Sequence, residues 1–126
     1  MIDANNDGDI SITEAEKVEY IHFVGDINNK EELKGIEFFN KQKQLSIRYI
    51  TNTTIDVSKN TELESLGCND NRLTTLDVSK NTKLSYLRCL PMCDITGRNL
   101  LTTIYMSNNQ VIQYFYKPEA TVVEYK

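Results

Sequence analysis

The chain has 126 residues, enough for one domain, and its 40% hydrophobic and 25% charged residues are typical of a folded protein. The net charge of −4 argues against broad electrostatic binding of nucleic acid. No stretch approaches the roughly eighteen apolar residues of a membrane span, and no signal peptide is visible.

An acidic stretch with a central glycine opens the chain: residues 3–14 have the sequence DANNDGDISITE. Gly8 permits a sharp turn, Ile10 is suited to point inward, and the final glutamate can bind a metal with both oxygens. The stretch resembles the EF-hand calcium loop, which implies a bound Ca²⁺ ion. Its expected ligands are Asp3, Asn5, Asp7, the backbone carbonyl of Asp9, and Glu14.

A polar surface turn that caps the following helix is the alternative interpretation of these residues. Only Met1 and Ile2 precede the loop, so the entering helix of an EF-hand is missing, and no second loop is present to pair with it. A half-site of this kind is expected to bind calcium weakly.

The next segments, together with the loop, predict an N-terminal cap over residues 1–40. Residues 12–19 continue from the loop as a short helix, and residues 20–24 alternate enough to form a first strand. Residues 30–39, KEELKGIEFF, predict a second helix with Leu33 and Ile36 on one face and Phe38 or Phe39 as its anchor.

A nine-residue phrase occurs twice in the middle of the chain, as TTIDVSKNT at residues 53–61 and TTLDVSKNT at residues 74–82. A degraded third copy, TTIYMSNN, begins at Thr102. Repetition at a period in the low twenties predicts a solenoid with one turn per repeat. The main functional feature of a solenoid is an extended surface rather than a buried pocket.

Within one repeat, the spacing L-x-x-L-x-C-x-x-N-x-L predicts a strand followed by a turn. Leu66 and Cys68 share the inner face of the strand, and Leu87 is expected beside Leu66 on the adjacent parallel strand. Asn71 suits the turn, and stacked asparagines can bond carbonyls left bare by irregular coil. Asp56 and Asp77 are placed outside on the opposite wall.

The repeat register fails after Cys89 and returns when seven residues are skipped, which predicts an insertion at residues 90–97. Gln42 and Asn52 stand where leucine is expected, so the first full turn is expected to be poorly formed. Residues 121–125 are β-rich and are expected to pair with the last coil and close the core. The coils therefore extend over residues 41–126 and form one folded unit with the cap.

The words LDVSKNTKLSYLRC and LESLGCNDNRLTTLDVSKNT resemble the leucine-rich repeats of secreted and surface proteins of gut Bacteroidetes, and more distantly those of internalins. The resemblance covers roughly residues 36–116. It implies an α/β solenoid with parallel strands, a helical N-terminal cap and a C-terminal β cap. It also implies a non-enzymatic binding module, located outside the cell or on its surface.

The cysteines and the histidine do not indicate catalysis. Cys68 and Cys89 occupy equal repeat positions and are expected to be buried, reduced and inert, whereas Cys93 lies in the insertion and is expected to be exposed. His22 is the only histidine, and no nucleophile elbow, phosphate loop or zinc-protease motif accompanies it. Nothing in the sequence selects an acid/base pair, so we predict that the chain is not an enzyme.

The outward positions of the repeats predict a binding face. Equal positions stack into columns, and two neighbouring columns bring together Tyr86, Arg88, Tyr114 and Tyr116. Tyrosine and arginine are enriched at interface hot spots, although tyrosine also populates ordinary sheet surfaces. A monomer with a protein or glycan ligand is expected. A purely structural spacer, or the end of a larger surface protein, is the alternative.

Overall fold

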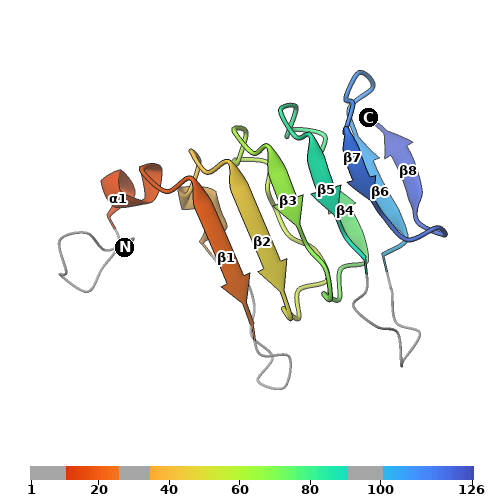
Figure 1. Ribbon diagram of the computed structural model, residues 1–126, viewed down its shortest axis with the longest axis horizontal. Helices are drawn as coiled ribbons and strands as arrows, with labels where there is room; N and C mark the ends of the chain where they lie inside the picture. Colours follow the sequence, from red (N-terminus) through yellow and green to blue (C-terminus); the bar gives the residue numbers. More distant parts are fainter. Residues whose placement is uncertain (1–10, 26–34, 91–100) are drawn as a thin grey trace.

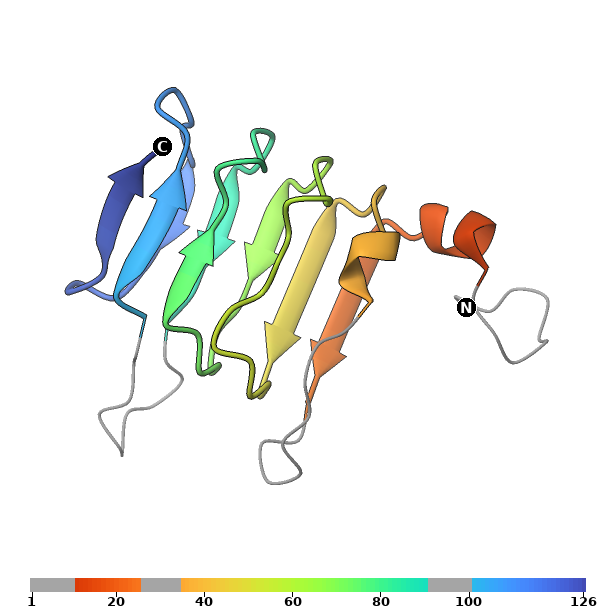
Figure 2. The same cartoon turned by 180° about the vertical axis from the view of Figure 1, so that it is seen from behind.

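The computed structural model describes residues 11–25, 35–90 and 101–126, and these residues form a coil of short parallel strands (Figure 1). Two sheets make the two walls of the coil, and the core lies between them (Figure 2). Sheet A has the strand order β1-β2-β3-β5-β7, and sheet B has the order β4-β6-β8. The strands of sheet A are β1 (Tyr20–Val24), β2 (Gln44–Arg48), β3 (Ser65–Gly67), β5 (Tyr86–Arg88) and β7 (Tyr114–Tyr116).

Sheet A confirms the predicted repeat register. Leu66 of β3 lies opposite Leu87 of β5, and Leu87 lies opposite Phe115 of β7. Side chains alternate between the two faces of a strand, so residues opposite one another in the register face the same side. The column that contains Leu66 and Leu87 therefore faces the core. Leu66 and Leu87 are fully buried.

Sheet B consists of β4 (Thr75–Asp77), β6 (Thr103–Met106) and β8 (Val122–Tyr125). Leu76 pairs with Ile104, which confirms the jump of seven residues in the repeat; residues 91–97 of the predicted insertion lie outside the described residues. β8 pairs with β6 in parallel, as predicted for residues 121–125. β8 therefore continues sheet B by one strand, and its closing of the core stays a prediction.

The architecture is a β-solenoid, and the predicted α/β class contained too much helix. Among the described residues the helical elements are α1 (Ile12–Glu16) and the 3-10 turn η1 (Ile36–Phe38). Both are too short to establish the expected helical cap. No helix in the described ranges is long and apolar enough to cross a membrane.

Both helix predictions need correction. The helix expected over residues 12–19 is shorter, because Lys17 already forms its C-cap. The single helix expected over residues 30–39 is wrong where the structure describes it. Gly35 adopts a left-handed φ of 81°, which interrupts an α-helix, and η1 begins directly after it. Ile36 enters the core and Phe39 packs against it, whereas Phe38 is 57% exposed.

Buried amide side chains connect successive coils away from the strands. The Asn60 amide donates to the carbonyls of Ile36 and Phe39 at 3.0 Å each. Asn81 repeats the arrangement one coil later, and the Gln110 amide does so again on the carbonyls of Val78 and Asn81. Each of these carbonyls also accepts a backbone N–H from its own turn, so the amides add a second hydrogen bond that links one coil to the next.

The first full turn is better formed than the sequence indicated. β2 has five residues and pairs with both β1 and β3. Gln42 stands in the position that Leu63 and Leu84 occupy in later coils, and it is fully buried. Neither side-chain polar atom of Gln42 has a hydrogen-bond partner among the described residues.

Replacing Gln42 with leucine is expected to stabilise the fold by about 1–3 kcal/mol, because the buried amide loses its bonds to water and gains none in return. Urea unfolding of the purified chain measures this. The control is Gln44→Leu two residues later, an exposed site where the change should stay within ~0.5 kcal/mol. A less stable Gln42→Leu protein would mean that the amide is satisfied after all.

Candidate functional site: the outer face of sheet A

The outer face of sheet A carries two columns of side chains, fixed by the strand register. The first column contains Tyr20, Gln44, Ser65, Tyr86 and Tyr114. The second column contains His22, Ser46, Gly67, Arg88 and Tyr116. The two columns alternate with the buried leucine column, so their members point away from the core.

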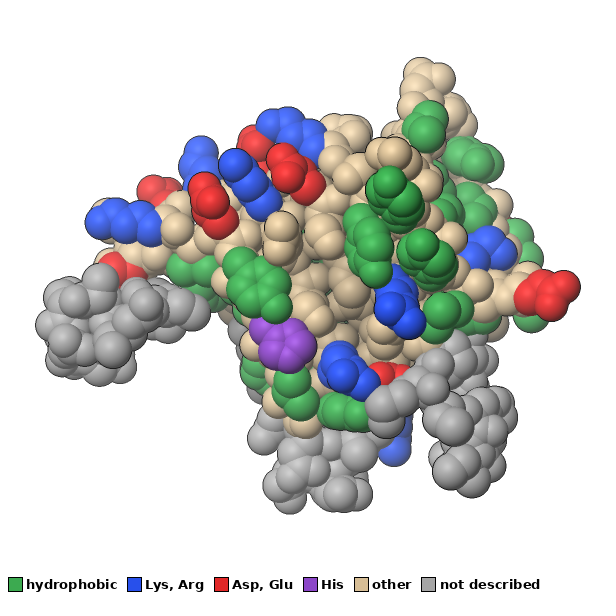
Figure 3. Space-filling model, viewed as in Figure 1, with side chains coloured by type: hydrophobic (Ala, Val, Ile, Leu, Met, Phe, Trp, Pro, Cys, Tyr) green, Lys and Arg blue, Asp and Glu red, His purple; other side chains and the backbone are tan. Residues whose placement is uncertain are grey.

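Three tyrosines, Tyr86, Tyr114 and Tyr116, gather at one end of this face, and we call them the tyrosine cluster. The Tyr86 ring centroid lies 6.4 Å from that of Tyr114 and 6.0 Å from that of Tyr116, within the range of aromatic pairing. Tyr114 is 50% exposed and Tyr116 is 45% exposed. Figure 3 shows several hydrophobic side chains gathered on the part of the surface that overlies β5 and β7.

Arg88 belongs to the same end of the face. It lies on β5, with Gly67 opposite on one side and Tyr116 opposite on the other. Its side chain is exposed, and the described residues offer it no carboxylate partner. The structure thus brings the four predicted contact residues together, and their role in binding stays a prediction.

The far end of the face was missed by the sequence reasoning. Tyr20, His22 and Val24 project from β1, and Tyr20 and Val24 are 57% and 51% exposed. β1 lies 24 residues before β2 in register, rather than 21, so the repeat did not extend back to it. Alternation within β1 was the only available signal. In Figure 3 the histidine marks this end. Gln44, Ser46, Ser65 and Gly67 separate it from the tyrosine cluster along the two columns.

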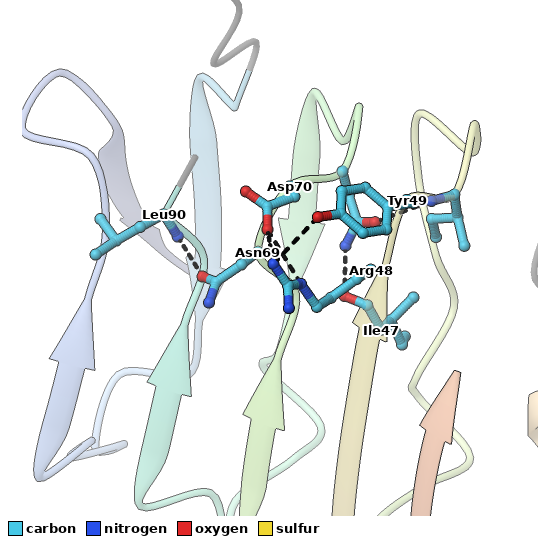
Figure 4. A network of polar contacts seen from close by, with 8 residues as sticks. Ile47, Arg48, Tyr49, Asn69, Asp70 and Leu90 are labelled. Carbon is cyan, nitrogen blue, oxygen red and sulfur yellow. Dashed lines mark hydrogen bonds and ion pairs between the residues drawn. The ribbon is translucent and has the colours of Figure 1, made fainter. Parts of the chain in front are cut away.

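A polar network borders the face at the ends of β2 and β3 (Figure 4). Arg48 donates through Nε and Nη2 to one carboxylate oxygen of Asp70, at 3.1 and 2.7 Å. These hydrogen bonds raise the pKa of Arg48 above its ordinary value. The Arg48 guanidinium also lies 5.1 Å from the centre of the Tyr49 ring. Tyr49 and Asp70 hold left-handed φ angles of 60° and 59° at equal positions of successive coils.

Asparagines complete this border. The Asn71 amide donates to the carbonyl of Ile47 in β2 at 2.9 Å. Ile50 stands at the equal position of the preceding coil, so Asn71 is not part of an asparagine stack there. Asn69 accepts a hydrogen bond from the backbone N–H of Leu90 at 2.8 Å. The turns at this edge are therefore tied to one another across coils, and they hold β2, β3 and β5 at fixed spacing.

Of the predicted calcium ligands, Asp3, Asn5, Asp7 and Asp9 lie outside the described residues. Glu14 is described: its carboxylate accepts hydrogen bonds from the N–H and the hydroxyl of Ser11, at 2.9 Å each. Ser11 in turn accepts from the Glu14 N–H, which completes a capping box at the start of α1. In the described part of the chain, no three potential metal-binding side chains come together.

The opposite wall, where the sequence placed Asp56 and Asp77, carries acidic turns. Asp56 accepts from the Ser58 N–H, and Asp77 accepts from Ser79 and from the Lys126 ammonium at 2.7 Å. A hollow of about 240 Å³ lies beside Asp56. Residues lining it include Gly35, Glu37, Asn52 and Thr54. Nothing among its described residues selects a ligand.

Cys68 and Cys89 lie one coil apart as buried free thiols, as predicted. Contact with the Cys89 thiol, together with burial, raises the pKa of Cys68 well above its usual range. A thiol that stays protonated is a poor nucleophile. Cys93 lies outside the described residues.

Comparison with solved structures finds the functional domain of InlJ from Listeria monocytogenes, a structure described as including a cysteine ladder. The two chains are 23% identical with a TM-score of 0.53, and the likeness covers 78% of this chain. It spans 22% of the InlJ chain. No protein-family model matches this chain, and no curated protein sequence matches it. The likeness supports an internalin-like, leucine-rich repeat solenoid and carries no information beyond the fold.

The stacked thiols are expected to resist labelling in the folded protein. With excess aromatic disulfide reagent, Cys93 should react first, and Cys68 and Cys89 should react only on unfolding. Mass mapping of the labelled chain identifies the sites. The Cys93→Ser protein serves as the control and should show no rapid reaction. Rapid labelling of Cys68, or a Cys68–Cys89 disulfide, would contradict the assignment.

Proposed function

We propose that this chain is a non-enzymatic binding module of the extracellular space or cell surface. It binds a protein ligand through the outer face of sheet A. The observation that carries the proposal is the tyrosine cluster with Arg88 beside it. The Tyr86 ring packs against the rings of Tyr114 and Tyr116, which limits the motion of all three side chains. Each side chain combines an apolar ring with a polar hydroxyl, and this combination suits the centre of an interface.

The placement of the side chains favours recognition over catalysis. His22 is exposed on β1, with Ser46 opposite on β2, and no carboxylate occupies either neighbouring outward column. The carboxylate of Asp70 is bound to Arg48 and holds the border of the face. An open sheet face without a convergent acid and base fits binding better than proton transfer.

Removing Tyr86 or Tyr114 should therefore weaken ligand binding. We expect each alanine substitution to cost about 2 kcal/mol or more, roughly 30-fold in affinity, as at other hot spots. A pull-down from host and bacterial surface extracts identifies a ligand, and titration of the purified pair gives its affinity. Tyr125→Ala is the matched control, since Tyr125 is 59% exposed on the other sheet.

Unchanged affinity in both tyrosine variants would place the working face elsewhere, on the opposite wall with Asp56, Lys59, Asp77 and Lys80. A chain that binds nothing alone, yet supports binding within a longer repeat array, would favour the structural spacer. Capture of a glycan in place of a protein would redirect the choice of ligand.

A structural calcium site at residues 3–14 is the second part of the proposal. Its support is the order of oxygen donors in the sequence, together with Gly8 at the position of the sharp turn. Glu14 lies in the first turn of α1, where one carboxylate would serve both the capping box and the ion. Calcium would then tie the loop to the start of the helix.

Calcium titration of the purified chain is expected to give one site of ~10⁻⁴–10⁻³ M affinity, the range of weak extracellular modules. Glu14→Gln should remove binding but keep the cap, because glutamine also completes a capping box. Titration calorimetry measures the binding, and the thermal midpoint of the wild type should rise until the site saturates. Glu16→Gln, on the exposed side of α1, is the control. No heat at several times the upper value of that range would refute the site.

A further inference from the structure

We propose that the space above Gly67 is a subsite for a carboxylate, supplied by an acidic segment of the protein ligand. The notch, as we call this space, lies in the second column of sheet A, with Ser46 on one side and Arg88 on the other. This inference rests on the proposed function, and it specifies which chemical group of the ligand the outer face of sheet A would bind.

Gly67 leaves open space that its backbone does not require. A side chain added at Gly67 would meet only Ser46 at its first carbon, at 3.7 Å from the hydroxyl and 4.0 Å from Cα and Cβ, which are ordinary contacts. Among the described glycines, Gly35 alone has a left-handed φ, so Gly67 is extended and any residue fits its conformation. Glycine weakens a strand, and in such a place it often marks a close approach by a ligand.

The two neighbours of the notch are hydrogen-bond donors. Ser46 offers a hydroxyl, and the exposed Arg88 offers a guanidinium that has no carboxylate partner among the described residues. Guanidinium groups bind carboxylates through two parallel N–H bonds. Arg48, by contrast, already holds Asp70 at 2.7 Å. Arg88 is therefore the cation of this face that is available to a ligand.

The distribution of charge on the chain favours an anionic ligand here. The chain has 18 acidic residues, yet neither outward column of sheet A contains an aspartate or a glutamate. The charged pairs Lys43–Glu19 and Lys83–Glu62 lie just before the strands of sheet A, and Figure 3 shows red and blue side chains along that ridge. An approaching carboxylate would meet donors and rings on the face and no like charge in either column.

The rings favour a protein segment over a polysaccharide. The Tyr86 ring is tilted by 45° to that of Tyr114 and by 54° to that of Tyr116, so the cluster offers no common plane for a row of sugar rings. Five parallel strands span four spacings of ~4.8 Å, about 19 Å in all. That width accommodates a few residues of an extended or looped segment.

Display of random twelve-residue peptides, selected on the whole purified chain, tests the subsite. Selected peptides should be enriched in aspartate or glutamate next to an apolar residue. A synthetic copy of the best binder, with its acidic residue changed to the amide, should bind at least tenfold less tightly. Polygalacturonate is titrated in parallel as an acidic polymer without peptide.

The decisive variant is Gly67→Thr, which fills the notch with a residue that strands favour. Its thermal midpoint should equal or exceed that of the wild type, and its affinity for the selected peptide should fall at least tenfold. Arg88→Gln should lower affinity about 10- to 100-fold, because a hydrogen bond to a charged group is lost. Arg72→Gln makes the same change at an exposed residue outside both columns and should leave affinity unchanged.

The outcomes separate this inference from the proposed function. If Tyr86→Ala abolishes peptide binding while Gly67→Thr and Arg88→Gln leave it intact, the face binds a ligand and the notch takes no carboxylate. A selection that returns no binder, or binders without acidic residues, overturns the subsite. Binding of polygalacturonate in place of peptides overturns the choice of a protein ligand. If Gly67→Thr destabilises the protein, the peptide affinity of Arg88→Gln decides the test, because that substitution does not change the conformations open to the backbone.

Discussion

The stacking of each coil on the next in fixed register is the constraint on which the structure depends. A single coil cannot satisfy its own polar groups, because its strands bond only to strands of neighbouring coils. The Asn81 amide shows the dependence away from the strands, since both of its hydrogen bonds, at 2.9 and 2.8 Å, reach carbonyls of the preceding coil. A shift of one residue would break the sheet ladders and these buried bonds together, so the register is specified twice.

Fixed register also separates structural from functional information within the chain. Positions that face inward repeat closely: Leu45, Leu66 and Leu87 form one column, and Asn60 and Asn81 hold equal roles in another. Outward positions on sheet A vary from coil to coil although the backbone there is the same. Because these side chains lie outside the core, they can vary from serine and glycine to tyrosine and arginine without disturbing the coil. The proposed binding face uses positions of this kind.

The repeats made sheet A predictable from Leu66 onward, because the 21-residue offset fixes both strand pairing and the outward columns. Features that depend on single residues could not be predicted from the repeat pattern. The left-handed φ of Gly35 breaks the helix that the pattern of Leu33 and Ile36 favoured, and the 24-residue step from β1 to β2 hid the end of the face that carries Tyr20. The buried amide of Gln42 also escaped, since periodicity indicates where a polar residue is unexpected but not that the fold will bury it.

The distance between the notch and the tyrosine cluster limits the kind of ligand that uses both. Gly67 lies on β3 and Tyr114 on β7, two strand spacings apart with β5 between them, or about 10 Å. Side chains two residues apart on an extended segment leave the same face ~7 Å apart, and flexible termini extend that reach. One acidic and one apolar side chain on such a segment can therefore occupy the notch and the cluster together. Both contacts act across the strands, so a segment crossing the sheet engages them better than one aligned with it.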